Sequence, residues 1–270
     1  MKKYYQSDFY EKPIEVENVE GDITVSIYDK LDRGAVYSWY NMVDKSSHSD
    51  YINKCILGGL LQENIKNILV LGVGGGAFIK YIEDHIPNIN ITGVDIDKTM
   101  IEIAKKELCI QTDDLIVGDI IKVIGDLQRR NITYDMILFD VYGSTGEIPQ
   151  SITDLTLFKK IQSILTKTGI FSINYANFFI HSNETLDIIR KEAYGNIHHN
   201  LKNIFGNHFL AFLDKEPEGG NISGIYNLKK KIIRDDIKRE YFQKVKNNGF
   251  IYDEKIIEGI YLDEKKLFLQ

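Results

Sequence analysis

The sequence predicts an α/β fold, in which a small N-terminal β-domain precedes a doubly wound, mostly parallel sheet. Two observations support this prediction. From Asn67 onward, short apolar runs rich in β-branched residues alternate with segments of helical periodicity, which is typical of a parallel sheet covered by helices on both faces. Before that point, residues 14–29 alternate apolar and polar side chains around Glu20-Gly21-Asp22, which indicates a β-hairpin. With 43% hydrophobic residues, the 270-residue chain can bury a substantial core.

The elements of the first half follow in order. Residues 35–43, "AVYSWYNMV", are aromatic and β-branched and predict a third strand, and residues 49–62 predict a helix. Asp97 is placed to cap a helix at 98–108, because an aspartate in that position accepts hydrogen bonds from free backbone amides. We further expect strands at 67–72, 89–95 and 114–119, and helices at 76–85 and near 120–129.

The second half continues the alternation. It predicts a strand at 134–140 and a strand at 170–176, with Gly169 ending the turn before the second of these. Between them we expect a helix at 151–166, with one apolar stripe formed by Leu155, Phe158, Ile161 and Leu165. A helix after residue 183, strands at 209–214 and 221–229, and a C-terminal helix with a weak hairpin should follow. The expected domains are residues 1–46, 47–230 and 231–270.

Composition and charge argue against several classes of partner. A net charge of −6 and a pI near 5.6 give no electrostatic footprint for nucleic acid. No apolar run approaches the ~20 residues of a membrane span, and the N-terminal segment lacks the apolar core of a signal peptide. Cys55 and Cys109 stand beside apolar residues far apart in the sequence, so we expect two buried free thiols and a cytoplasmic protein.

A cluster of glycines marks the first candidate site. In "NILVLGVGGGA", residues 67–77, a buried strand leads into Gly72, Gly74, Gly75 and Gly76 just before a predicted helix. Glycine permits both a tight turn and the close approach of a ligand to the backbone. The letters also satisfy G-x-G-x-x-G/A, the fingerprint of Rossmann-like dinucleotide sites, so the glycines alone leave a nicotinamide cofactor open.

Three aspartates end the next three predicted strands. Asp95, followed by Ile96, is spaced to accept hydrogen bonds from two ribose hydroxyls. Asp119, followed by Ile120, can accept from an exocyclic amine such as adenine N6 or, equally, cap the next helix. Asp140 should point into the crevice where open α/β sheets bind ligands. Together with the glycines, these five residues predict a nucleoside cofactor site on a Rossmann-like sheet.

The stretch from Ile68 to Leu108 resembles the spermidine synthase family of class I S-adenosylmethionine-dependent transferases. The resemblance extends in layout over residues 14–230. It implies a small N-terminal β-domain, a Rossmann-like domain, often a homodimer, and S-adenosylmethionine or its decarboxylated form as cofactor. By motif position it implies that the donor's amino-acid part lies against Gly72, Gly74 and Gly76, its ribose against Asp95 and its adenine amine against Asp119, with Asp140 as the first acid of the family's D-x-x-D motif.

Three departures from the family pattern bear on the reaction. Gly75 stands where aminopropyl-transferring members carry the acid of G-G-G-D-G. Residues 140–143 read D-V-Y-G, without the second acid of D-x-x-D, and residues 51–53 read Y-I-N in place of Tyr-His-Glu. A buried polycation needs carboxylate partners, so these losses disfavour a polyamine. S-adenosylmethionine carries a carboxylate of its own and tolerates Gly75 better than the decarboxylated donor does.

The sequence therefore predicts an S-adenosylmethionine-dependent alkyltransferase, with methyl transfer favoured over aminopropyl transfer and a small-molecule acceptor. Asp140 should orient the acceptor or accept its proton. Tyr142 should gate the pocket or orient the acceptor, unless it is an exposed loop aromatic. The loop 143–150 is expected to form a lid, in which Glu147 adds negative charge.

Two alternatives from other classes stay open. A nicotinamide oxidoreductase rests on the Gly/Ala fingerprint, and a non-catalytic nucleoside-binding protein rests on the missing acids. The histidines lack the spacing of metal ligands, and we expect no metal site.

Overall fold

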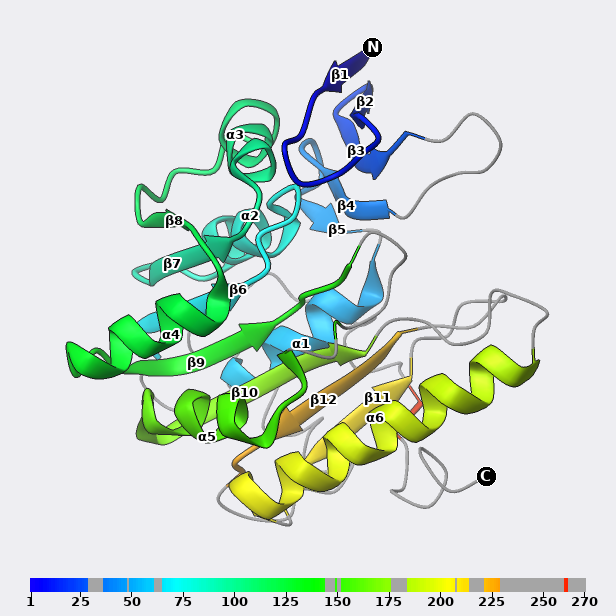
Figure 1. The fold of residues 1–270 in the computed structure, drawn as a ribbon. Helices are drawn as coiled ribbons and strands as arrows, with labels where there is room; N and C mark the ends of the chain where they lie inside the picture. The colour runs from blue at the N-terminus through cyan, green and yellow to red at the C-terminus, as the bar shows by residue number, and fades with distance from the viewer. Residues whose placement is uncertain are drawn as a thin grey trace.

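The computed structural model describes residues 1–28, 36–47, 49–60, 65–143, 149, 152–175, 184–206, 208–213, 221–228 and 260–261 (Figure 1). Over these residues the chain forms two sheets. The N-terminal sheet is antiparallel throughout, and its strands follow one another in sequence order. They are β1 (Lys2–Tyr5), β2 (Ile14–Val19), β3 (Asp22–Ile27), β4 (Val36–Asn41) and β5 (Ser46–Ser47).

The main sheet is parallel at its centre. Its described strands have the order β13-β11-β12-β10-β9-β6-β7-β8, and the run from β10 to β8 is parallel. Strands β12, β11 and β13 pair antiparallel at one side. The bounds are β6 (Asn67–Leu71), β7 (Asn90–Asp95), β8 (Leu115–Val117), β9 (Tyr134–Phe139), β10 (Leu165–Tyr175), β11 (Leu210–Leu213), β12 (Ile222–Tyr226) and β13 (Ile260–Tyr261). The strand order reverses between β6 and β9, which is where such sheets bind ligands.

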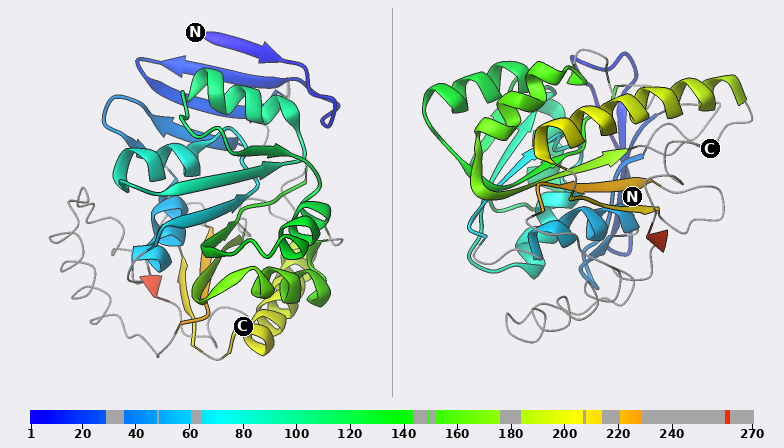
Figure 2. Two further views of the ribbon diagram at one scale, coloured as in Figure 1. Left: turned by 90° about the vertical axis from the view of Figure 1, so that its left-hand side faces the viewer. Right: turned by 90° about the horizontal axis from the view of Figure 1, so that it is seen from below.

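Helices cover both faces of the main sheet. Side chains from α1 (Asp50–Leu60), α2 (Ala77–His85) and α3 (Lys98–Glu107) join the N-terminal sheet in one apolar cluster. Those from α4 (Ile120–Arg129), α5 (Leu155–Ser163) and α6 (Glu184–Phe205) build a second cluster on the opposite face. Figure 2 shows α5 and α6 on one side of the sheet and α1 on the other.

Alternation along the strands explains the two clusters. In β6, Ile68 and Val70 enter the first cluster, whereas Leu69 and Leu71 enter the second. All four are at most 1% exposed, because successive side chains point to opposite faces and both faces are covered. Full burial of one such side chain stabilises the fold by roughly 2 kcal/mol.

Most predicted elements are confirmed, with shifts at their ends. The hairpin turns at Glu20 and Gly21, and Asp97 caps α3 by accepting a hydrogen bond from Thr99 N at 2.8 Å. The predicted strand 114–119 is shortened to β8, because Asp119 already belongs to the cap of α4.

The predicted helix 151–166 is wrong at both ends. Asp154 caps α5, which therefore starts at Leu155, and β10 already begins at Leu165, where the chain pairs with Tyr134. The register shift between Leu165 and Ile170 explains why the sequence indicated a strand only from residue 170. The buried stripe of α5 is formed by Leu157, Phe158 and Ile161, so neither Leu155 nor Leu165 belongs to it.

The predictions for the cysteines and for the C-terminal segment are confirmed only in part. Cys55 is buried, but Cys109 is exposed, because it follows the end of α3 in a left-handed conformation with φ 53°. Both thiols are free. In the C-terminal segment 231–270 only β13 is described, and the predicted domain boundaries stay predictions. None of the described helices combines the length and apolar character that crossing a membrane requires.

Candidate functional site

The glycine loop connects β6 to α2 at the point where the strand order reverses. Gly72 has φ +88°, and its amide donates to Val94 O at 2.9 Å. A Cβ at this position would lie 2.1 Å from the carbonyl oxygen of Asp140. Only glycine therefore lets the ends of β6 and β9 approach so closely.

Asp95 lies beneath this loop and is 8% exposed. Its Oδ2 accepts a hydrogen bond from Gly74 N at 2.9 Å, and its Oδ1 accepts one from Asp97 N at 2.9 Å. Burial raises the pKa of Asp95 to about 6, although backbone hydrogen bonds from Asp97 and Gly74 oppose the rise. Asp95 thus holds the glycine loop in place, a function that its position in the sequence did not reveal.

The N-terminal segment reaches the same carboxyl end of the sheet. Ser7 Oγ donates to Asp97 Oδ2 at 2.7 Å. Tyr10 is 8% exposed, and its ring centroid lies 5.5 Å from that of Tyr37 in β4. Burial raises the pKa of Tyr10, and the charges of Tyr37 and Asp95 raise it further. Residues from the N-terminal sheet therefore line the region beside Asp95.

Asp119 is the N-cap of α4. Its Oδ1 accepts a hydrogen bond from Ile121 N at 2.8 Å, so the predicted capping interaction is present. The side chain of Ile120 is 6% exposed and packs in the second cluster. Ile96, which follows β7, is 48% exposed, and Val117, which pairs with Asp95 at the end of β8, is 50% exposed. Their side chains offer apolar surface at this edge of the sheet.

Asp140 follows β9 and is half-buried among polar neighbours. Its Oδ1 accepts a hydrogen bond from Asn174 Nδ2 at 2.9 Å, and its Oδ2 accepts a weaker one from Tyr51 OH at 3.4 Å. Desolvation raises the pKa of Asp140 to about 6, although the bonds from Asn174 and Tyr51 oppose the rise. Asn174 Oδ1 is also buried and accepts no hydrogen bond from the described residues.

Tyr142 is not an exposed loop aromatic. It is half-buried against the second cluster, and its hydroxyl donates to the carbonyl oxygen of Asn174. Tyr37 OH donates to Gly143 O at 3.2 Å, so the N-terminal sheet reaches the segment after β9. The predicted lid lies outside the described residues except for 143 and 149, and Glu147 is among the residues not described.

A family model describes more than half of this chain. Residues 54–202 match the model of the spermine/spermidine synthase domain. The chain belongs to the spermine/spermidine synthase family.

The proteins that are similar to this chain in sequence include methyltransferases. The chain is 32% identical over 124 residues to the eEF1A lysine and N-terminal methyltransferase of Mus musculus, which is 43% of this chain and 18% of that protein. It is 28% identical over 141 residues to the Drosophila melanogaster homolog, which is 49% of this chain and 20% of that protein. The chain thus spans about a fifth of the length of these relatives.

Solved structures show the same fold. A probable spermidine synthase from Corynebacterium glutamicum superposes with a TM-score of 0.71 at 17% identity, over 98% of this chain and 91% of the other. Human Methyltransferase-like protein 13 in complex with SAH gives 0.55 at 21% identity, over 80% of this chain and 92% of the other.

Within this spermine/spermidine synthase fold, the predicted residues divide into two groups. The glycine loop and Asp95 are in direct contact, and Asp140 meets the loop through Gly72. Asp119 caps α4 just after β8, and among the described residues it makes no hydrogen bond to the glycine loop, Asp95 or Asp140. Sequence reasoning missed Asn174. It could have been recognised as a polar residue near the end of the apolar strand "IFSINYA", since the aspartates were identified by the same pattern.

Proposed function

We propose that this chain is an S-adenosylmethionine-dependent methyltransferase that acts on an amine nitrogen. One observation carries the choice of acceptor. Asp140, whose backbone lies against Gly72 of the glycine loop, and Asn174 Oδ1, which is buried without a donor among the described residues, form a pair of hydrogen-bond acceptors. An amine supplies an N–H donor for Asn174 Oδ1 and another for the carboxylate, which already accepts from Asn174 and Tyr51.

The residues around the loop fit an adenosyl donor. Gly72 and Gly74 are partly exposed and would take the donor's amino-acid part, and Asp95 would bind its ribose. Asp119 and the backbone of Ile120 would meet the adenine edge, and the exposed Ile96 would pack on its face. When bound, the donor supplies an electrophilic methyl carbon and a neutral thioether leaving group.

The chain's own residues then have two tasks. Asp140 and Asn174 orient the acceptor nitrogen toward the donor, and Asp140 accepts a proton from the acceptor. A pKa of about 6 suits this role, because the carboxylate is ionised at neutral pH but is a stronger base than an exposed aspartate. Tyr51 and Tyr142 lie beside this pair, since one contacts Asp140 and the other contacts Asn174.

The relatives support this choice. Two of the curated proteins named above are lysine and N-terminal methyltransferases, so their acceptors are amines. A probable polyamine aminopropyl transferase of Bifidobacterium longum is 26% identical over 137 residues, which keeps aminopropyl transfer as the second candidate. Both reactions alkylate an amine nitrogen. The homodimer and the cytoplasmic location stay predictions.

Calorimetry and an activity assay test the proposal together. The chain is titrated with S-adenosylmethionine, decarboxylated S-adenosylmethionine and NAD, and methyl transfer is measured on a panel of peptide and small-molecule amines. We expect S-adenosylmethionine to bind most tightly. Asp140→Asn should lower kcat by about 100-fold or more and leave donor affinity within about twofold, because general-base catalysis contributes a factor of this size.

The matched control lies in the same strand. Asp135→Asn alters a carboxylate of β9 that accepts hydrogen bonds from Lys66 N and Asn67 N, far from the glycine loop. It should retain near-normal kcat. If the chain binds the decarboxylated donor more tightly, the proposed reaction becomes aminopropyl transfer instead of methyl transfer. If it binds NAD alone, the proposal is refuted.

A further inference from the structure

Helix α2, which follows the glycine loop, begins without a cap of its own. Its N-cap residue is Gly76, which has no side chain to accept from the first amides. The acceptor comes from another part of the chain, because Ala77 N donates to Ser38 Oγ at 3.3 Å. Ser38 lies in β4 of the N-terminal sheet and is 4% exposed. The cap of α2 is therefore supplied across the boundary between the two sheets.

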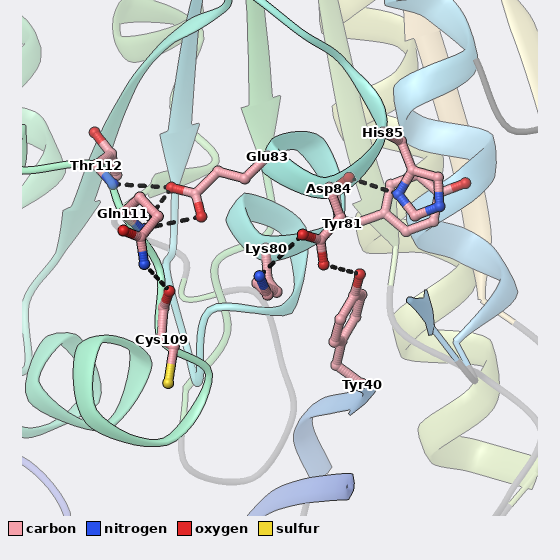
Figure 3. A network of polar contacts seen from close by, with 9 residues as sticks. All are labelled: Tyr40, Lys80, Tyr81, Glu83, Asp84, His85, Cys109, Gln111 and Thr112. Carbon is pink, nitrogen blue, oxygen red and sulfur yellow. Dashed lines mark hydrogen bonds and ion pairs between the residues drawn. The ribbon is translucent and has the colours of Figure 1, made fainter. Parts of the chain in front are cut away.

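The same strand also holds the last turn of α2. Tyr40 lies two residues after Ser38, so both side chains point from the same face of β4. Tyr40 OH donates to Asp84 Oδ2 at 2.8 Å, and Lys80 Nζ pairs with Asp84 Oδ1 at 2.9 Å. Figure 3 shows Tyr40 reaching up from the strand to Asp84 beside Lys80. Both ends of the helix are thus fixed by one strand.

Gly75 shows how closely β4 approaches the loop. A Cβ at Gly75 would lie 2.7 Å from Ser38 Cβ, 2.8 Å from Ser38 Oγ and 2.6 Å from Val25 Cγ2. No side chain fits between the loop and the N-terminal sheet. Since Asp95 holds Gly74 N from the other side, the loop is fixed between Asp95 and Ser38.

We propose that Ser38 is a positioning residue for donor binding, which caps α2 from the N-terminal sheet and thereby fixes the glycine loop. This inference rests on the proposed function, because it assumes that the loop receives the donor. Ser38 itself does not touch the ligand. Its removal leaves the first turn of α2 uncapped, so that the glycine loop samples conformations that fit the donor less well.

The test compares two serines of the same sheet. Ser38→Ala removes the cap, whereas Ser47→Ala removes a buried hydroxyl in β5, a strand that also packs beside α2 but whose hydroxyl bonds to Trp39 O and Ser49 and not to an amide of the helix. Calorimetry with S-adenosylmethionine gives the affinity, and thermal unfolding verifies that both variants are folded. Hydrogen exchange at the amides of residues 77–80 reports on the first turn of α2.

We expect Ser38→Ala to raise Kd about fivefold, the size of a lost helix cap, and to speed exchange at residues 77–80. Ser47→Ala should change Kd by less than about twofold, because it lies outside the loop's contacts. Equal Kd for Ser38→Ala and the unchanged chain, or equal weakening by both variants, would overturn this inference alone. Failure of the unchanged chain to bind S-adenosylmethionine would overturn the proposed function and the inference with it.

Discussion

At the scale of single residues, the site depends on atoms that approach unusually closely. Gly72 admits the carbonyl oxygen of Asp140 to a place where any side chain would collide. Asn174 holds the carboxylate of Asp140 and keeps one buried oxygen without a donor among the described residues. An unpaired buried acceptor costs stability, so its retention beside a raised carboxyl pKa indicates a function.

Gly72→Ala should destabilise the protein by about 3 kcal/mol, because a left-handed backbone and a steric clash both add to the cost. Gly206→Ala is a matched control, since Gly206 has φ +87° and nothing within 4 Å of the added Cβ. It should cost about 1 kcal/mol, from backbone strain alone. Urea unfolding of both variants measures the difference. Equal losses would show that the contact with Asp140 does not constrain position 72.

At the scale of elements, aspartates cap the helices that start near the carboxyl edge of the main sheet. Asp97, Asp119 and Asp154 each accept from the second amide of α3, α4 and α5, respectively. One of these caps, Asp119, lies where the donor is proposed to bind. A cap in that position leaves carboxylate lone pairs available to a ligand, so capping and ligand binding do not exclude each other.

Asp119→Ala and Asp154→Ala separate the two functions. Each should lower stability by about 1 kcal/mol through loss of a helix cap. Only Asp119→Ala should also weaken S-adenosylmethionine binding, by about tenfold, because a hydrogen bond to the adenine amine is lost as well. Thermal unfolding and calorimetry provide the two readouts. If donor affinity is the same in both variants, Asp119 is a cap and nothing more.

At the scale of the whole molecule, the two sheets enclose the site between them. The N-terminal sheet packs in one cluster with α1, α2 and α3, and it contributes Ser38, Tyr37 and Tyr10 to the surroundings of the loop. Two acidic side chains of the site, Asp95 and Asp140, have a pKa raised to about 6 by burial. At neutral pH these buried carboxylates are ionised, and their ionisation lowers the stability of the folded state.

This loss has a defined pH dependence. A carboxyl whose folded pKa is raised stays protonated in the folded state while the unfolded chain ionises, so its contribution to stability is complete below about pH 4 and is lost as pH rises to about 6. Asp140→Asn replaces the carboxyl group by an amide that does not ionise, so the variant does not lose this stability as pH rises. Relative to the unchanged chain, the variant should gain about 3 kcal/mol of stability between these pH values.

Glu107→Gln is a control of opposite sign. Burial raises the pKa of Glu107, but hydrogen bonds from Lys3 and Tyr5 outweigh it and leave the pKa lowered. That variant should lose stability relative to the unchanged chain as pH rises, because ionised Glu107 stabilises the fold. Denaturant unfolding at several pH values measures both differences. A pH-independent difference for Asp140→Asn would contradict a raised pKa at this carboxyl.

Local patterns in the amino-acid sequence were enough to predict the order of strands and helices, the glycine loop and the aspartates at the strand ends. These features are local, because side-chain periodicity and turn chemistry act over a few residues. Their boundaries moved where a cap or a strand pairing intervened, as at Asp154 and Leu165.

Contacts between side chains far apart in the sequence could not be predicted and became visible in the folded chain. Asn174 reaches Asp140 from 34 residues away, Tyr51 from 89, and Ser38 reaches Ala77 from 39. No periodicity encodes such pairs, since each depends on how two sheets and their helices pack. For the same reason Gly75, which the sequence presents as a missing acid, is also a position where the N-terminal sheet leaves no room for a side chain.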